Sequence, residues 1–590
     1  MPTHSVRLDS LLLTTAAMGL ALAVTSPYRD ARAADVCGAG TTTISSAQAG
    51  TDNCTLNAGE SVDITGAGSI PFTGANPSIE VANGVTAGSI TNAGTASTVS
   101  ANESAILIRT NGTLTNGIVN NGTISSGDGS GITFASSGSI TANGITNASG
   151  ADITVDVSGI VLNSNSSVTG GITNAGTITA NGVDGNHGIS LFGTSTVAGG
   201  ITNSGTIDTS AGGIHLGGAA SVTSGGITNS GTITSTDGIV ISFTTTVTGS
   251  VNNSGIITAS DVGVLVTNGS ADGIVNQAGG IITGGSNSIE IVSATAPVTV
   301  TNAGLLDGNV QLEDGTLNLN GASARVDGTI NGVGSSTVNV NGDFTTEGTL
   351  SVGTLAVAAA GELTLDNNVT ASSFTNAGTV AIADGATRTV TGDYSQTGSG
   401  LLQIGATSDS SFGKLSVSGT ADFSASDALH VTVGAGDSLA NGDQLDDVVQ
   451  AGTLTASGVT VTDNSALLAF EGVIDGNTID LEVASTRSIE TIVNSGGNGG
   501  GAGAVLDDII DEGASGDMQN IVDSLNALGT DQEVNAAVQK LLPAINGNHA
   551  QSNVSAAQAG ATNVVLNQLI RLSGINAGDV VCPACSIARE

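Results

Sequence analysis

The chain has 590 residues, of which 87 are glycine, 2% are aromatic and none is tryptophan. The 50 acidic residues against 11 basic ones give a formal charge of -39, which leaves no basic stripe for phosphates and argues against nucleic acid or an anionic membrane surface as partner. Glycine has no three-residue period, so a collagen-like triple helix is excluded. The composition favours a chain that turns every few residues around a thin, β-branched core.

Residues 1–33 are typical of a secretory signal peptide. Arg7 precedes an apolar run over residues 11–24, and a small-x-small signal predicts cleavage between Ala33 and Ala34. The run has about fourteen residues, fewer than a membrane-spanning helix needs, and no later stretch reaches that length either. The mature chain is therefore expected to be exported and to contain no transmembrane helix.

Residues 34–87 are predicted to cap the N-terminal end of the structure that follows. Cys37 and Cys54 flank a Gly/Thr/Ser-rich loop here, and in an oxidising compartment a disulfide between them would staple the exposed first coil. The other two cysteines, Cys582 and Cys585, have the spacing of a redox dithiol or of half a zinc site. Neither use has support, because no second cysteine pair, following histidine or strand–helix unit accompanies them. No cofactor or metal is expected.

One phrase, Ile-Thr-Asn-Ala/Ser-Gly-Thr or a near variant, returns nine times between residues 90 and 302. Its asparagines are 23 to 29 residues apart, and a fixed period of this size indicates stacked supersecondary units. Stacked asparagines can bond amide to amide at each corner. The asparagines of this ladder are Asn92, Asn120, Asn147, Asn174, Asn203, Asn229, Asn253, Asn276 and Asn302.

A second, apolar ladder shares this period, with pairs 25 to 29 residues apart. Within the units apolar residues alternate, as in Ile214-His215-Leu216, which is the periodicity of a strand. Three short strands per period predict an all-β fold, a right-handed parallel β-helix over residues 88–390. At about 25 residues per coil, the body from Gly59 to Val483 would have about 17 coils and a length of about 80 Å. The pairs are Ile106/Ile108, Ile132/Phe134, Ile160/Leu162, Ile189/Leu191, Ile214/Leu216, Ile239/Ile241, Val264/Val266 and Ile289/Ile291.

Residues 391–485 have longer strand patterns, and turns at Asp463-Asn464 and at Asp475-Gly476-Asn477 predict hairpins. A terminal unit that pairs with itself would close the open end of the stack. Residues 486–504 are predicted to be a glycine-rich linker. Residues 505–590 have helical periodicity, with a capping box at Thr530 to Glu533 and a last helix at about residues 552–572.

This order of signal peptide, Asn-Ala/Ser-Gly-Thr repeats, capping module and helical tail resembles an autotransporter, the type V secretion family of Gram-negative bacteria. The resemblance implies export to the periplasm, passage through an outer-membrane translocator barrel, and a passenger that folds at the cell surface or outside the cell. It also implies the family's C-terminal β-barrel, yet no aromatic residue follows Phe470 to form a barrel's girdles. A truncated or split gene product and a separate translocator both remain open, and the tail, which resembles the lead-in to a barrel, favours truncation.

The sequence contains little evidence for a catalytic site. The chain has no G-x-S-x-G elbow and no His-Glu-x-x-His. Gly436-Asp437-Ser438-Leu439 spells the short signature of an esterase family, but Asp427 and His430 precede the serine, whereas that family places its Asp-x-x-His far downstream. A turn is the favoured interpretation.

Two histidines and two glycine-rich segments are candidates for metal ligation. His187 and His215, in neighbouring repeats, could approach one another, but no carboxylate or cysteine accompanies them at a ligand spacing, so solvent-facing side chains are expected. The segments 127–131 and 279–280 lack the nine-residue iteration of a calcium roll. No catalytic, cofactor-binding or metal-binding residue is therefore predicted.

The predicted function is that of a non-enzymatic adhesin or self-association rod, whose Thr/Ser/Asn ladders would meet host or bacterial surface ligands. The alternative is a secreted β-helix carbohydrate-active enzyme. That enzyme needs carboxylates with arginine or lysine on one coil face, which is hard to build with only two lysines, Lys414 and Lys540. Three carboxylates and an arginine converging on one face would favour it.

Overall fold

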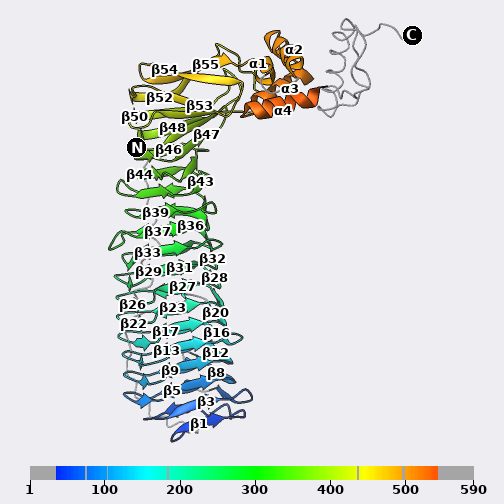
Figure 1. The fold of residues 1–590 in the computed structure, drawn as a ribbon. Coiled ribbons are helices and arrows are strands. Elements are labelled where there is room, and N and C mark those ends of the chain that lie inside the picture. Colours follow the sequence, from blue (N-terminus) through cyan, green and yellow to red (C-terminus); the bar gives the residue numbers. More distant parts are fainter. Residues whose placement is uncertain are drawn as a thin grey trace, which may run out of the picture.

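The computed structural model describes residues 35–542, apart from 74–75, 102–103, 183–184, 435–436 and 495–498. These residues form a parallel β-solenoid of about 15 turns, followed by four short helices (Figure 1). The predicted solenoid with a helical tail is confirmed, with slightly fewer turns than the 17 expected. The signal peptide, the cleavage site at Ala33 and Ala34, the last predicted helix, Cys582 and Cys585 lie outside the described residues.

The first stack of strands runs the length of the rod and contains the ladder asparagines. Its strands pair in parallel and in register, as Ile145, Thr146 and Asn147 do with the same residues of the next coil. Its members are β1 (Thr41–Ile44), β3 (Ser61–Ile64), β7 (Ile90–Asn92), β11 (Ile118–Asn120), β15 (Ile145–Asn147), β19 (Ile172–Asn174), β23 (Ile201–Asn203), β27 (Ile227–Asn229), β31 (Val251–Asn253), β35 (Ile274–Asn276), β37 (Thr299–Asn302), β39 (Thr316–Leu319), β42 (Thr337–Val340), β44 (Leu350–Val357), β46 (Val369–Asn376), β48 (Thr387–Gln396), β50 (Lys414–Asp422) and β52 (Gln444–Thr455).

A second stack follows the ladder asparagines along each coil. It contains β4 (Ser69–Phe72), β8 (Thr95–Ala101), β12 (Thr123–Asp128), β16 (Asp152–Val155), β20 (Thr177–Ala180), β24 (Thr206–Thr209), β28 (Thr232–Ser235), β32 (Ile256–Ala259), β36 (Ile281–Val292), β38 (Leu305–Gln311) and β40 (Arg325–Asp327). A separate six-stranded sheet covers the later coils with β43 (Asp343–Thr345), β45 (Glu362–Thr364), β47 (Thr379–Ile382), β49 (Leu401–Ala406), β51 (Ala428–Val433) and β53 (Thr460–Asp463).

A third stack contains the apolar ladder. It consists of β2 (Cys54–Leu56), β5 (Ile79–Val81), β9 (Ile106–Ile108), β13 (Ile132–Phe134), β17 (Ile160–Leu162), β21 (Ile189–Leu191), β25 (Gly212–Leu216), β29 (Asp237–Ser242) and β33 (Val262–Thr267), and it continues into β36, β38 and β41 (Ile330–Asn331).

A fourth, shorter stack completes the repeat coils, so the prediction of three strands per period was incomplete. Each of these strands buries a single residue, so the sequence shows no alternation of apolar residues there. Its members are β6 (Thr86–Ala87), β10 (Thr113–Leu114), β14 (Ser139–Ile140), β18 (Ser167–Thr169), β22 (Thr196–Ala198), β26 (Ser221–Ser224), β30 (Thr246–Val247) and β34 (Ser270–Ala271).

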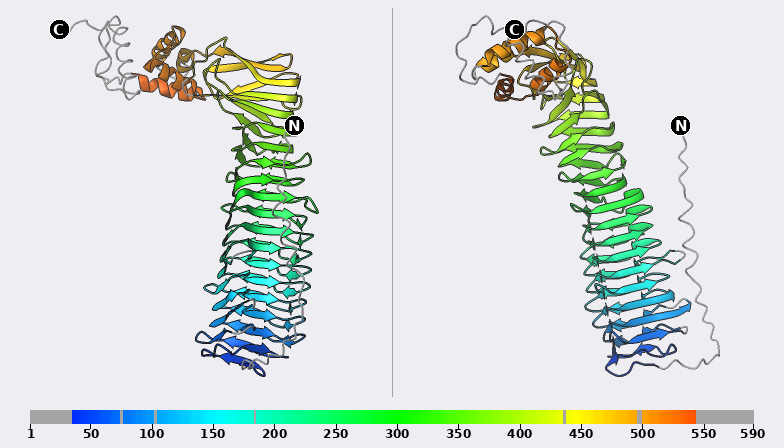
Figure 2. Two further views of the ribbon diagram at one scale, coloured as in Figure 1. Left: turned by 180° about the vertical axis from the view of Figure 1, so that it is seen from behind. Right: turned by 90° about the vertical axis from the view of Figure 1, so that its right-hand side faces the viewer.

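The core is one continuous column of stacked side chains inside the rod. It extends from Ile44 in the first coil to Val483 in the cap, and both residues of every pair in the apolar ladder are 0–1% exposed. Inward residues alternate with outward polar ones because a strand points successive side chains to opposite faces. The column bends gently when the rod is seen from the side (Figure 2).

The C-terminal end of the rod is closed by antiparallel strands. β54 (Leu468–Asp475) and β55 (Thr478–Thr486) form a hairpin, and β55 also pairs antiparallel with β52. The predicted turn at Asp475-Gly476-Asn477 is confirmed. The predicted hairpin at Asp463-Asn464 is wrong, because β53 pairs in parallel with β51 and Asn464 Oδ1 instead accepts a bond from the Val433 N–H.

Four helices pack beside this cap around a second, smaller core: α1 (Ile489–Asn494), α2 (Gly500–Asp511), α3 (Asp517–Asn526) and α4 (Asp531–Leu541). Within the predicted linker 486–504, α1 and the start of α2 are helical, which differs from the prediction. Ile489, Ile492 and Val493 are buried there, and at Gly503 a Cβ would lie 2.7 Å from the Glu490 Cα, so glycine permits the close contact of α1 and α2. None of the described helices is long and apolar enough to cross a membrane.

Candidate functional site

The nine ladder asparagines form one unbroken chain of side-chain hydrogen bonds. The Nδ2 of each of the first eight donates to the Oδ1 of the asparagine in the following coil, at distances of 2.7 to 2.9 Å. The same amide also donates to a backbone carbonyl of the next coil, as Asn174 does to Thr206. All nine side chains are 0–1% exposed. The ladder is therefore a structural element of the interior.

Apolar neighbours end this chain of amides. Ile64 lies in register before Asn92, whose Oδ1 has no hydrogen-bond partner among the described residues. Leu319 lies after Asn302, whose Nδ2 instead donates to the carbonyls of Gly304 and Arg325.

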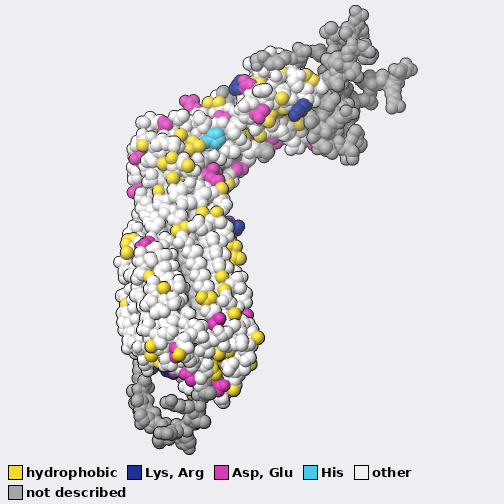
Figure 3. Space-filling view, turned by 60° about the horizontal axis from the view of Figure 1, so that its bottom comes forward, with side chains coloured by type: hydrophobic (Ala, Val, Ile, Leu, Met, Phe, Trp, Pro, Cys, Tyr) yellow, Lys and Arg dark blue, Asp and Glu magenta, His cyan; other side chains and the backbone are white. Residues whose placement is uncertain are grey.

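Only outward side chains can meet a partner, and the ladder asparagines are not among them. The expectation that asparagine rows are displayed is therefore wrong for this ladder, because the third residue of each Ile-Thr-Asn strand points inward. On the second stack, hydroxyl and acidic side chains lie in register on the outside, and on the face in Figure 3 few side chains are charged. This outward row contains Ser125, Thr154, Thr179, Asp208, Thr234, Thr258 and Thr283.

The structure joins Cys37 and Cys54 in a disulfide bond, with a Cα–Cα distance of 4.9 Å. Cys54 begins β2 and is fully buried. The Asp35 carboxylate accepts bonds from the backbone N–H groups of Cys37 and Thr55, so the segment before β1 is held against β2. The disulfide and these hydrogen bonds together fasten the N-terminal end of the described chain to the first coil.

His187, Phe192 and His215 form a ring cluster on the side of the rod. The ring centroids of the two histidines are 4.4 Å apart, and Phe192 lies 5.3 Å from His215 and 6.1 Å from His187. Burial lowers the pKa of His187 to about 4, and burial together with the neighbouring His187 lowers that of His215 to about 3. Both rings are therefore uncharged at neutral pH, and both side chains are half-buried, so they remain partly open to solvent.

A groove of about 370 Å³, here called the lateral groove, runs beside this cluster. Outward residues of β13, β17 and β21 form its floor, and residues just before these strands, among them Ser130, Ser158 and His187, form one wall. The Ser190 hydroxyl at the floor is fully buried and has no hydrogen-bond partner among the described residues. The residues that define the groove are Ser104, Asp128, Gly129, Ser130, Thr133, Val157, Ser158, Val161, Asn163, Gly185, His187, Ser190 and Phe192.

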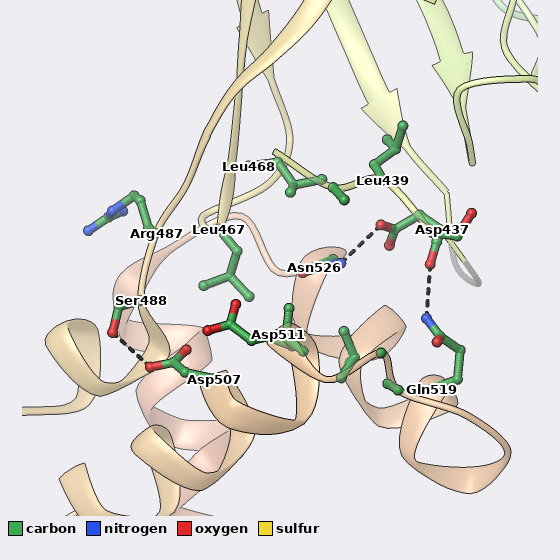
Figure 4. Close-up of a pocket in the computed structure, with 16 residues that line it drawn as sticks. Asp437, Leu439, Leu467, Leu468, Arg487, Ser488, Asp507, Asp511, Gln519 and Asn526 are labelled. Carbon is green, nitrogen blue, oxygen red and sulfur yellow. Dashed lines mark hydrogen bonds between the residues drawn. The ribbon is translucent and has the colours of Figure 1, made fainter. Parts of the chain in front are cut away.

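A second pocket, of about 340 Å³, lies between the cap and the helices (Figure 4). Asp437 lines it and is 0% exposed; its Oδ1 accepts a 2.9 Å bond from Asn526 Nδ2, and its Oδ2 has no partner among the described residues. Burial raises the pKa of Asp437 to about 6, against the opposing effect of the Asn526 bond. Asp437 and Asn526 are 89 residues apart, and no local signal could have paired them.

The esterase-like residues do not converge. Ser438 is exposed and follows the buried Asp437, and its backbone N–H donates to the Thr407 carbonyl. The His430 ring Nδ1 lies 3.0 Å from Thr462 Oγ1 on the neighbouring strand. Asp427 accepts a backbone bond from Thr460 through its carbonyl. Residues 437–440 belong to no helix or strand, and Gly436 lies outside the described residues.

A third hollow, of about 360 Å³, gathers charges that the sequence suggested would be hard to assemble. Arg325 forms ion pairs with Asp327 and, at 3.2 Å, with Glu347. Arg325, Glu347, Asp343 and Glu362 all line this hollow, because short coils of about twenty residues bring them into successive layers. Among the described residues, no three histidine, cysteine or acidic side chains are placed to hold a metal ion.

Comparison with known proteins finds no matching family model, no matching curated protein and no matching solved structure.

Proposed function

We propose that this protein is an exported rod that acts at the surface of a Gram-negative bacterium as a non-enzymatic adhesin or self-association module, in the manner of an autotransporter passenger. The observation that supports this most is the solenoid itself, about 15 turns with hydroxyl rows in register on its outside. A long, sparsely charged surface of this kind suits repeated weak contacts with a partner along its length. Host or bacterial surface molecules would be its ligands.

The Cys37–Cys54 disulfide supports the proposed route, because disulfides persist in the periplasm and outside the cell rather than in the cytosol. In this proposal residues 1–33 direct export, and an outer-membrane translocator, encoded with the chain or separately, carries the rod to the surface.

Expression in a Gram-negative host tests the proposal. An epitope inserted between Gly476 and Asn477, at the tip of the cap hairpin, marks the rod at an exposed turn. We expect the exported protein to begin at Ala34 and to contain the oxidised cysteine pair. When a translocator is present, protease added to intact cells should cleave the rod. Cells that display the uncleaved rod should aggregate. A matched chain without residues 2–33 should stay in the cytosol. Retention of Met1 on a cytosolic full-length chain, or displayed rods that change no cell contact, would refute the proposal.

A second function, a carbohydrate-active enzyme, is favoured by one observation, the hollow that contains Arg325 with Asp343, Glu347 and Glu362. Carboxylates on facing positions can share acid and base roles on a sugar chain. Release of reducing ends from a panel of polysaccharides should then require Glu347, with Glu347→Gln inactive and Glu471→Gln, an exposed acid in the cap, fully active. No release by the wild-type chain would reject this function.

A further inference from the structure

The lateral groove differs from the rest of the rod in what its outward positions carry. On the third stack the floor residues Thr133, Val161 and Ser190 lie one above another in consecutive coils. Val161 is 9% exposed, so an apolar strip lies between two hydroxyl groups. Phe192 and His187 line one end, in a chain that has only 9 phenylalanines and 5 histidines. Apolar surface thus lies in the middle of the groove floor, and aromatic surface lies at one end.

Polar groups line the rest of the groove with both donors and acceptors. The Ser104 and Thr133 hydroxyls are 2.6 Å apart, and Asn163 and the exposed Asp128 add an amide and a carboxylate. Asp128 is the only acidic side chain among the lining residues, and no arginine or lysine lines the groove. The His187 ring is uncharged at neutral pH. An anionic ligand would therefore find no counter-charge here, whereas a neutral ligand rich in hydroxyl groups would find partners.

The direction and spacing of the groove suggest the form of the ligand. Its floor crosses three coils along the axis of the rod. Coils are about 4.8 Å apart, and a pyranose unit in a linear chain advances by roughly 5 Å, so one sugar unit would lie over each coil. A pyranose has an apolar face that packs on rings such as Phe192, and an equatorial rim of hydroxyls that bonds to carboxylates and amides.

We infer that the lateral groove binds an uncharged oligosaccharide of about three pyranose units, aligned with the solenoid axis, with its terminal unit against Phe192 and its hydroxyls on Asp128 and Asn163. This inference deepens the proposed adhesive function, on which its biological meaning rests, by naming the ligand class. Binding to the purified chain and aggregation of displaying cells are separate measurements, so each can fail without the other.

The test is titration of the full chain with maltotriose, cellotriose and laminaritriose, and with trigalacturonate as an anionic probe of the same length. Saturation-transfer NMR and calorimetry report binding. We expect saturable binding of at least one neutral trimer and none of trigalacturonate. Phe192→Ala and Asn163→Ala should each weaken that binding by about tenfold or more. The matched control is Phe243→Ala, because Phe243 is 56% exposed and does not line the groove.

Val157→Trp is a second test variant, and its substitution lies outside the buried core. Val157 is 40% exposed at the rim of the groove, so a larger side chain there would obstruct the groove without disturbing the column, and binding should be lost. No saturable binding of any neutral trimer at millimolar concentration would overturn the inference. Tighter binding of trigalacturonate, or unchanged binding by the folded Phe192→Ala and Val157→Trp variants, would overturn it as well.

Discussion

Each ladder asparagine depends on its neighbours in the coils before and after it. Asn174 accepts a 2.7 Å bond from Asn147 and donates one of the same length to Asn203, and all three side chains are fully buried. A buried amide is costly unless its partners are present, so one asparagine in an otherwise apolar column would be unfavourable. The series is stable because the period places an identical residue above and below.

Replacing Asn174 with alanine should therefore destabilise the coil by more than the loss of one surface bond. Asn203 Oδ1 would lose its side-chain donor, which costs about 1–3 kcal/mol for a buried group. Hydrogen exchange of the amides of β19 and β23 measures this local opening. Thr173→Ala, on the outward side of the same strand, is the control and should change it by less than about 0.5 kcal/mol. Equal effects of the two substitutions would contradict the role assigned to the ladder.

Asp437 predicts a pH dependence of the junction between the cap and the helices. Its folded pKa of about 6 lies above the ordinary value of 3.8, so folding favours the protonated form. The contact is therefore strongest below pH 4, weakens between pH 4 and pH 6 by about 3 kcal/mol for a shift of this size, and changes no further above that range. Asp523, which also faces Asp437, raises its pKa further.

Hydrogen exchange of α3 between pH 4 and pH 8, corrected for intrinsic rates, measures this effect. Asp437→Asn should remove the pH dependence and slow exchange at pH 8, because an amide carries no buried charge. Asp475→Asn, at the exposed tip of the hairpin, controls for net charge and should leave the profile unchanged. Faster exchange of α3 at pH 4 than at pH 8 in the wild-type chain would show that the sign is wrong.

At the scale of single elements, the two ends of the solenoid are protected in different ways. An open end exposes unpaired backbone groups and an apolar column, both of which invite association. A disulfide fastens the first coil, and an antiparallel hairpin and a helical bundle cover the last.

Removing the disulfide should loosen the first coil alone. Cys37 and Cys54 are 17 residues apart, and a loop of this length corresponds to about 3 kcal/mol of lost chain entropy in the unfolded state. The double variant Cys37→Ser, Cys54→Ser should therefore speed hydrogen exchange in β1, β2 and β3 while leaving β19 unchanged, because each coil contacts only its neighbours. A uniform change along the rod would contradict this expectation.

Opening the capped end should instead cause association. Leu481 of β55 is 1% exposed and lies opposite Leu445 of β52. Leu481→Asp would place a charge in this contact and separate the hairpin from the stack, so light scattering should detect concentration-dependent oligomers. Val473→Asp, on the exposed side of the same hairpin, should leave the chain monomeric. A monomeric Leu481→Asp variant would show that the hairpin does not protect this end.

At the scale of the whole molecule, the solenoid should tolerate the loss of one complete coil. Deleting residues 204–229 joins Asn203 to the coil that contains Asn253, and both ladders keep their register. We expect a folded rod shortened by about 4.8 Å, measured by small-angle scattering, with an unchanged circular dichroism spectrum per residue. Deleting residues 204–216, about half a coil, would put outward residues into the column and should abolish folding. Equal behaviour of the two deletions would contradict the stacked-coil architecture.

The sequence by itself determined the architecture of this protein. Both ladders could be predicted because a solenoid repeats the same environment in every coil. The same residue types therefore return once per coil, and their period in the sequence indicates how the coils stack. The hairpin at Asp475-Gly476-Asn477 and the capping box at Thr530 could be predicted for a different reason, because each is formed by residues close together in the sequence.

Only the tertiary structure decided which surfaces the rod presents. The inward orientation of the asparagines, the ring cluster of His187, Phe192 and His215, and the lateral groove arise from side chains in different coils. The burial of Asp437 depends on a helix 89 residues away, and the helices within the expected linker form because the cap offers them an apolar face. The ring cluster, the lateral groove and the contact of Asp437 leave no periodic trace, because the winding of the chain brings together particular residues whose distance along the sequence does not predict their contact.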